Sequence, residues 1–356
     1  MKPVRVMVVD DSAFMRQTLK MMIEEDPVLQ VVTTARDGRD ALIKLKRYHP
    51  DVVTLDIIMN GEMDGLQTLH HIMKQDPTPV IMVSGASDEH VNYVIEAISS
   101  GAFDFINKPS GKQADMESIG AKLQSKIHQA ALSRIRLSSA DQHITKSEDT
   151  NLFFPSPGGN NSPSLIVICT STGGPKALQT VIPALKKELS VPIIIIQHMP
   201  PRFTKTLAER LNSLSEVQVT EAADGEILQN GRVYIAPGGH HLIIKKNPDA
   251  LCFHLLDTPA VHGVKPAADV TLESLTHIPD LSVLVAVLTG MGKDGASGIM
   301  QLKESVQQVY VVAESEETSV VFGMPKAAIK THLVDEVCGI DHVAASICRQ
   351  FALKEG

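Results

Sequence analysis

Short apolar runs alternate with helical patterns along most of the chain, and this alternation constrains the fold more than any other feature. The first third contains five apolar runs, with segments between them whose apolar residues recur at helical spacing. These runs are Val4–Val9, Gln30–Thr34, Val52–Leu55, Val80–Val83 and Phe103–Ile106. Five strands that alternate with helices predict a doubly wound, five-strand parallel sheet.

The same alternation returns in the last 190 residues. The three most apolar runs there are Leu165–Cys169, Val191–Gln197 and Leu281–Leu288, and further short strands are expected to form hairpins around residues 237–239 and 247–248. The segment between the two halves is rich in Ser, Pro and Gly and has no apolar periodicity, which is typical of a linker. We therefore predict α/β domains at 1–130 and 164–352, the second with a mostly parallel sheet, and a flexible linker at 131–163.

Composition excludes several classes of protein. The net charge of −8 argues against a nucleic-acid binder, which needs a basic face. The four cysteines have no C-x-x-C spacing, so free thiols in a reducing compartment are expected. The N-terminus enters a strand directly, without the pattern of a signal peptide, and no apolar run approaches the roughly 18 residues that span a membrane. The sequence predicts a cytoplasmic protein without membrane insertion.

Polar residues follow the predicted strands of the first domain where the carboxyl ends of the strands meet. Because ligands of doubly wound sheets bind at this edge, the residues are candidates for one site. Clustered carboxylates repel each other, and a hard divalent cation such as Mg²⁺ relieves the repulsion. A lysine and a hydroxyl opposite them could hold a phosphoryl group, whereas the alternative is a set of solvated loop acids and helix caps. The residues are Asp10, Asp11, Asp56, Ser84 and Lys108.

These five residues, with Pro109 and with Phe105 as a switch aromatic, make residues 1 to about 125 resemble a response-regulator receiver domain, which has a flavodoxin-like fold. The resemblance implies that Asp56 accepts a phosphoryl group from a histidine kinase. It also implies that Mg²⁺ is bound at the three aspartates, and that the hydroxyl and the ammonium group contact the phosphoryl oxygens.

One segment departs from the receiver pattern. The loop that follows Asp56, Ile57–Gly65, is one residue longer than usual and lacks the usual proline, and it places the apolar Ile58 where relatives carry a polar side chain. The metal ligand expected at that position is a backbone carbonyl, so Mg²⁺ binding should survive. The shape of the loop and the rate of dephosphorylation are expected to differ.

The stretch Cys169–Gly174 joins a buried strand to a helix in the second domain. A hydroxyl at Ser171 therefore lies on a sharp turn, with two glycines and the free N–H groups of a helix start beside it. Such a turn suits a serine nucleophile with an oxyanion site. A phosphate-holding turn or a plain tight turn would have the same pattern.

Ser171, His198 and Asp294 follow the three most apolar strands of this domain. A serine hydrolase needs a hydroxyl, a base that accepts its proton and a carboxylate that orients the base, and one of each is expected at the same sheet edge. Asp294 could in addition cap the helix that begins at Gly295. Alternatives remain for each role: Cys169 as nucleophile, His241 or His262 as base, and Asp257 or Asp269 as acid.

Five segments give this domain a second resemblance. They are Ser171–Pro175, Gln197–Pro201, Tyr234–Gly239, Leu288–Gly295 and Phe322–Ala328, and they resemble the catalytic domain of chemotaxis protein-glutamate methylesterases. The resemblance implies the triad of Ser171, His198 and Asp294. It also places Thr172 and the N–H group of Met291 near the oxyanion, gives His241 a secondary role near the site, and implies no cofactor for the ester chemistry. Relatives usually read Gly-Ala-Ser where this chain reads Cys169-Thr170-Ser171.

The resemblance implies hydrolysis of glutamate methyl esters on methyl-accepting chemotaxis receptors, with release of methanol, and deamidation of receptor glutamines. It implies a monomer in which the unphosphorylated receiver covers the site until Asp56 is phosphorylated. The alternatives to an enzymatic output are a DNA-binding domain and a domain that only binds receptor tails. A DNA-binding domain is disfavoured because such domains are short and basic. The sequence does not exclude a domain that binds receptor tails without catalysis.

Overall fold

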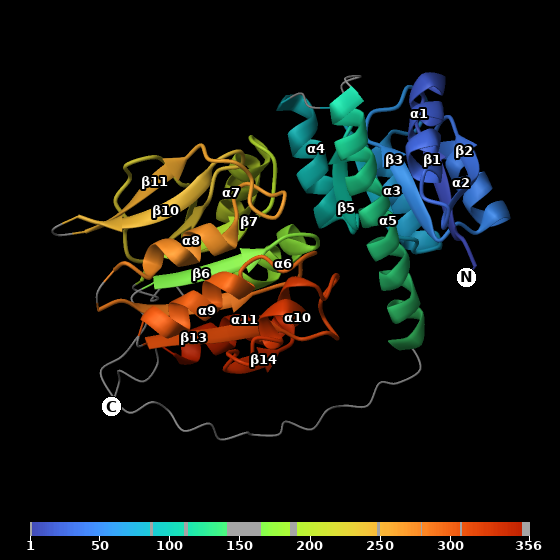
Figure 1. Cartoon of the computed structure of the whole chain (residues 1–356). Helices are drawn as coiled ribbons and strands as arrows, with labels where there is room; N and C mark the ends of the chain where they lie inside the picture. Colours follow the sequence, from blue (N-terminus) through green and yellow to red (C-terminus); the bar gives the residue numbers. More distant parts are fainter. Residues whose placement is uncertain are drawn as a thin grey trace. The chain divides into compact units, whose positions relative to one another are not determined.

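Two α/β units make up the chain, Met1–Leu152 and Phe153–Gly356 (Figure 1). The computed structural model describes residues 2–85, 88–109, 113–140, 165–185, 191–247, 250–278, 280–306 and 308–350. Most of the predicted linker lies outside the described residues, so its limits stay predictions. No helix in the described part of the chain is both long and apolar enough to cross a membrane.

The N-terminal unit contains a five-stranded sheet in the order β2-β1-β3-β4-β5, with every neighbouring pair parallel. This confirms the predicted doubly wound sheet, and the order is that of flavodoxin-like folds. Its elements are β1 (Val4–Val9), α1 (Ala13–Glu24), β2 (Leu29–Ala35), α2 (Gly38–Tyr48), β3 (Val52–Asp56), α3 (Gly65–Gln75), β4 (Val80–Ser84), α4 (Asp88–Ser99), β5 (Asp104–Asn107) and α5 (Gln113–Ala140).

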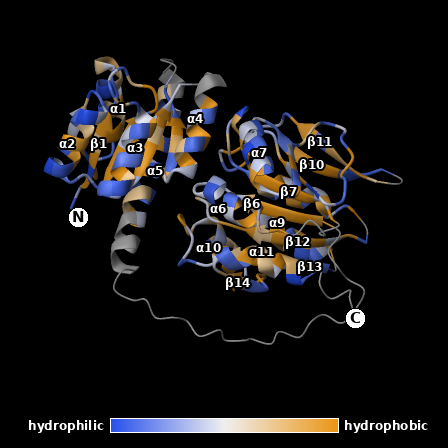
Figure 2. Ribbon diagram, turned by 180° about the vertical axis from the view of Figure 1, so that it is seen from behind, coloured by the Kyte–Doolittle hydropathy of each residue, from blue (hydrophilic) through white to orange (hydrophobic). Residues whose placement is uncertain are grey.

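Burial explains why these residues form these elements. All residues of β3 and β4 are buried, as expected for strands with helices on both faces. Figure 2 shows the apolar residues concentrated in the strands. Side-chain caps begin the helices: Ser12 accepts a hydrogen bond from the N–H of Met15 at α1, and Asp64 forms a capping box with Gln67 at α3.

Helix α5 continues to Ala140, through the first ten residues of the segment predicted to be linker. These residues include Ala, Leu and Arg, which favour helix, so the local propensity accounts for the extension.

The C-terminal unit contains a seven-stranded, wholly parallel sheet in the order β14-β13-β12-β6-β7-β9-β8, and a separate antiparallel hairpin of β10 and β11. Its elements are β6 (Leu165–Thr170), α6 (Gly174–Val181), β7 (Ile193–Gln197), α7 (Phe203–Leu214), β8 (Gln218–Glu221), β9 (Arg232–Ile235), β10 (His241–Lys246), β11 (Leu251–Leu256), α8 (Ala268–Leu275), β12 (Ser282–Val287), α9 (Ala296–Ser305), β13 (Gln308–Glu314), α10 (Met324–Ile329), β14 (Glu336–Cys338) and α11 (Ile340–Arg349).

One predicted hairpin exists and the other does not. β10 pairs with β11 across residues 247–250, as expected. The turn at 237–239 joins no hairpin, because β9 pairs with β7 and β8 inside the parallel sheet. Here the apolar pattern located both strands but could not reveal that they belong to different sheets.

The sheet order places three strand ends side by side. β6 lies between β7 and β12, with Thr170 opposite Gln197 and Cys169 opposite Val287. The chain turns to one side of β6 for β7 and to the other side for β12, so the end of β6 is a topological switch point. Ligands of open α/β sheets bind at such points. Ser171 is the first residue beyond this end of β6.

Candidate active site

The turn after β6 holds Ser171 through its backbone. The N–H of Ser171 donates to the carbonyl of Thr289 at 3.1 Å, and its carbonyl accepts from the N–H of Gly174 at 2.8 Å. Gly173, the N-cap of α6, has a φ of +79°, a conformation that favours glycine. The amide Nε2 of Gln197 donates to the Ser171 carbonyl at 3.1 Å and lies 3.4 Å from the His198 carbonyl. Gln197 thus links the strand ends that carry the predicted nucleophile and base.

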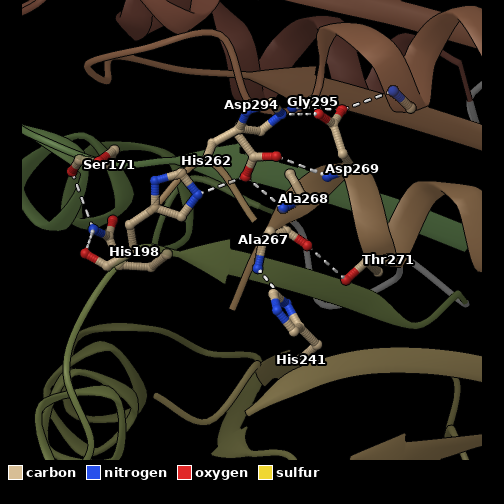
Figure 3. Close-up of polar contacts among 12 residues, drawn as sticks. Ser171, His198, His241, His262, Ala267, Ala268, Asp269, Thr271, Asp294 and Gly295 are labelled. Carbon is tan, nitrogen blue, oxygen red and sulfur yellow. Dashed lines mark hydrogen bonds and ion pairs between the residues drawn. The ribbon is translucent and has the colours of Figure 1, made fainter. Parts of the chain in front are cut away.

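His198 follows β7 and points its ring between the other two predicted triad residues (Figure 3). Its N–H donates to the Thr170 carbonyl at 3.2 Å, which fixes the residue against β6. Its Nε2 lies 2.7 Å from Oδ2 of Asp294. Among the described residues no side chain hydrogen-bonds to Oγ of Ser171. Catalytic hydrogen bonds are often long in ligand-free enzymes and shorten when substrate binds.

Asp294 is buried and its carboxylate accepts three hydrogen bonds. Besides His198, the N–H groups of Ala268 and Asp269 donate to it at 2.6 and 3.0 Å. Burial acts to raise the pKa of Asp294, but the His198 contact and the two N–H donors outweigh it and hold the pKa below its usual value. The predicted cap on its own helix is wrong: Asp294 caps α8, and Asp269 caps α9 through the N–H groups of Gly295 and Gly298.

Buried polar groups beneath the turn tie it to β12 and β13. The hydroxyl of Thr170 donates to the Thr289 carbonyl at 2.9 Å, and the Thr289 hydroxyl donates to the Thr172 carbonyl at 2.9 Å. The N–H of Thr289 in turn donates to the buried carboxylate of Glu314 at 2.7 Å. The Thr170 hydroxyl therefore adds a bond that anchors the turn. Sequence reasoning missed Thr289 and Glu314 because the contacts span up to 119 residues.

Cys169 is disfavoured as the nucleophile. Its side chain is fully buried in the core of the unit. Burial raises the pKa of its thiol well above the usual value, and the charges of Asp294 and Asp269 raise it further. The reactive thiolate is therefore suppressed.

The rival bases and acids have other partners. His241 is fully buried, with Nε2 3.0 Å from the Pro259 carbonyl and Nδ1 accepting from the N–H of Ala267 at 3.2 Å. Asp257 is 82% exposed and pairs with Lys265 at 2.6 Å. His262 and Asp269 pair with each other at 2.9 Å, next to Asp294 (Figure 3).

The predicted oxyanion residues lie on the segments that adjoin Ser171. Thr172 follows it directly and is buried, and Met291 is half-buried in the loop after β12. Between Thr289 and Met291, Gly290 packs so closely that an added Cβ would lie 2.9 Å from Cβ of Ser171 and 2.4 Å from Sδ of Met324. Only glycine allows this approach. The roles of Thr172 and Met291 stay predictions.

In the N-terminal unit, four of the predicted residues meet at the carboxyl ends of β1, β3 and β5. Carboxylate oxygens of Asp10, Asp11 and Asp56 lie within 4.8 Å of one another. Nζ of Lys108 contacts Oδ2 of Asp56 at 2.7 Å and of Asp10 at 2.9 Å. Burial raises the pKa of Asp56 to about 6, with the Asp10 charge adding to the effect and Lys108 opposing it. Burial lowers the pKa of Lys108, but its bonds to the two aspartates outweigh this and raise it.

The other two predicted residues of this unit are Ser84 and Phe105. Ser84 is buried at the end of β4 and its hydroxyl donates to the Gly85 carbonyl at 3.0 Å. Phe105 is buried in β5. Sequence reasoning missed Asn60, whose N–H and side-chain amide donate to Oδ2 of Asp11 at 3.0 and 2.8 Å. The unusual length of the loop after Asp56 was the available signal.

Comparison with known proteins shows the family of each unit. Residues 166–347 match the family model described as CheB methylesterase, and residues 6–119 match that of the response regulator receiver domain. A protein-glutamate methylesterase/protein-glutamine glutaminase of Halalkalibacterium halodurans is 45% identical over 348 residues, which are 98% of each chain. The chain belongs to the protein-glutamate methylesterase/protein-glutamine glutaminase family. The family member of Bacillus subtilis is 42% identical over 353 residues, 97% of each chain.

A solved structure of this family matches the C-terminal unit. The crystal structure of the Thermotoga maritima CheB methylesterase catalytic domain has a TM-score of 0.51 and 42% identity, and it covers 53% of this chain and 98% of that chain. The chain is therefore a chemotaxis response regulator with a hydrolase domain, as its sequence predicted.

Proposed function

We propose that the C-terminal unit hydrolyses glutamate methyl esters on chemotaxis receptors through Ser171, His198 and Asp294. The observation that carries the proposal is the contact of His198 with Asp294 at the switch point where β6 delivers Ser171. The names of the relatives support the substrate class, since they join a protein-glutamate methylesterase to a protein-glutamine glutaminase.

The arrangement supports acyl transfer through a serine ester. Asp294 holds Nε2 of His198, so Nδ1 is the nitrogen left to accept the proton of Ser171. Oγ attacks the ester carbonyl, and N–H donors beside the turn stabilise the oxyanion. The proton returns to the departing methoxide, which leaves as methanol, and the glutamyl-serine ester remains. His198 then takes a proton from water, which attacks this ester, and gives the proton to Oγ of Ser171 as the bond to the glutamyl group breaks and the glutamate is freed.

Deamidation follows the same steps. With glutamine as substrate the leaving group is ammonia instead of methanol, and the same glutamyl ester forms.

The test is to incubate the protein with methylated receptor and with receptor glutamine residues, and to measure methanol and ammonia. Release of neither product would leave only a receptor-binding role and would contradict the proposal.

In the N-terminal unit we propose that Asp56 is phosphorylated by a histidine kinase and that this controls the hydrolase. The three aspartates fit Mg²⁺, because they are hard oxygen donors, mutually close and largely buried. Asp10, Asp11 and Asp56 would hold the ion, which would supply positive charge to the incoming phosphoryl group. Lys108 is placed to contact that group, and Ser84 lies at the end of the neighbouring strand. A cytoplasmic location and a monomeric state stay predictions from the sequence.

Magnesium binding is expected to weaken as the pH falls through about 6. The pKa of Asp56 is raised to about 6, so below that pH the cation must displace a proton from its carboxyl group. We expect a Kd about tenfold higher at about pH 5 than at about pH 7, measured by isothermal titration calorimetry. An equal Kd at both values would contradict the assignment of Asp56 as a ligand.

Asp56→Asn is expected to abolish stimulation by a small-molecule phosphodonor, because an amide cannot form the acyl phosphate. Methanol release should stay at the unstimulated rate. Asp51→Asn is a matched control, since Asp51 lies at the other end of β3 and an amide oxygen can still accept the N–H of Arg5. The control should respond to the phosphodonor like the unmodified protein. A full response of Asp56→Asn would show that another residue is the switch.

A further inference from the structure

A second His–Asp pair lies against the one that carries the proposed chemistry. Nε2 of His262 is 2.9 Å from Oδ2 of Asp269, just as Nε2 of His198 is 2.7 Å from Oδ2 of Asp294. The binding atoms of His262, Asp269 and Asp294 lie within 4.8 Å of one another. The two pairs differ in exposure, because the side chain of His262 is 38% exposed and that of His198 only 6%.

The two carboxylates cap each other's helices. Asp294 accepts the N–H groups of Ala268 and Asp269, where α8 begins, and Asp269 accepts those of Gly295 and Gly298, where α9 begins. The cap residues Ala267 and Gly295 supply no side-chain cap of their own. Asp269 therefore fixes the peptide that follows Asp294 directly (Figure 3).

The charges of the two carboxylates also interact. Both are largely buried, so each needs its two N–H donors and its imidazole. Burial raises the pKa of Asp269, and the charge of Asp294 adds to this, while the bonds from Gly298, His262 and Gly295 oppose it. The titratable groups that face Asp269 are Asp294, His262 from the preceding loop and Cys169 from β6, and His198 lies beyond Asp294.

We propose that Asp269 is a positioning residue for the hydrolysis, which rests on the proposed function of Ser171, His198 and Asp294. Through the two N–H groups at the start of α9, Asp269 sets the place of the Asp294 carboxylate. His262 in turn orients Asp269 from the solvent side.

Two substitutions in the full-length protein test this positioning role. In Asp269→Asn the amide oxygen can still accept both N–H groups, whereas Asp269→Ala loses the caps and the charge. We expect Asp269→Ala to lower kcat about a hundredfold at unchanged KM, since Asp294 is no longer held in place. Asp269→Asn should recover most of kcat. The loss in Asp269→Ala and the recovery in Asp269→Asn should both appear in kcat and leave KM unchanged, because the proposed role acts on the position of Asp294 and not on substrate binding.

Asp257→Asn is the matched control, because it removes one negative charge from an exposed side chain that pairs with Lys265. Its kcat should equal that of the unmodified protein. A kcat of Asp269→Asn as low as that of Asp269→Ala overturns the inference, and so does an Asp269→Ala variant that folds and keeps the unmodified kcat. If Asp269→Ala fails to fold, a kcat of Asp269→Asn more than about tenfold below that of the unmodified protein overturns the inference. If the unmodified protein releases no methanol, the proposed function fails instead.

Discussion

Replacement of Ser171 by alanine is expected to lower methanol release from methylated receptor by about four to six powers of ten. The loss is large because no other described group is placed to attack the ester. Cys169, the nearest alternative, is fully buried and its thiol is held protonated. The measurement is the initial rate of methanol formation at saturating substrate, with circular dichroism to confirm the fold.

Ser213→Ala is a suitable control for this substitution. Ser213 is an exposed serine near the end of α7, and its hydroxyl donates only to the Arg210 carbonyl of the same helix. This variant should release methanol at the unmodified rate. If Ser171→Ala were equally active, Ser171 would not be the nucleophile and the triad assignment would fail.

Asp294→Asn is expected to lower kcat by about three to four powers of ten. The substitution removes the charge that stabilises the His198 imidazolium. In one orientation of the amide, an N–H group faces Nε2 of His198 and forces the ring into the wrong tautomer. In the other, an N–H group faces the N–H of Asp269, which then loses its acceptor. Either orientation should also lower Tm, because a helix cap is impaired.

The same rate assay and a thermal melt check this expectation, with Asp257→Asn as an exposed Asp-to-Asn control. Unchanged kcat in Asp294→Asn would show that the carboxylate is a helix cap and no more. Reduced Tm with unchanged kcat is the outcome that separates the two roles most clearly.

The sequence predicted that Ser171, His198 and Asp294 lie at one sheet edge, because parallel sheets bring the carboxyl ends of their strands together. An apolar run precedes each of Ser171, His198 and Asp294. These runs are β6, β7 and β12, which are neighbours in the sheet with β6 in the middle. The sheet order itself was not in the pattern, since apolar runs do not reveal which strands pair. The false hairpin at 237–239 has the same cause, because β9 and β10 pair with strands other than each other.

Long-range contacts account for the rest of what sequence reasoning missed. A capping rule that considers only adjacent residues assigned Asp294 to its own helix, whereas its acceptor bonds go to α8, 25 and 26 residues away. Thr289 and Glu314 likewise support the turn at Ser171 through bonds that no local pattern reveals. For Asn60 a local signal existed, because Asn60 lies in the lengthened loop after Asp56.

Mass spectrometry of protein quenched with acid during turnover of a methylated receptor peptide tests the central claim most directly. The claim is that Ser171 forms an ester with the receptor glutamate. We predict an adduct of the receptor peptide on Ser171, and none in Ser171→Ala. An adduct on Cys169 or on another residue, or methanol formation by Ser171→Ala at the unmodified rate, would contradict the claim.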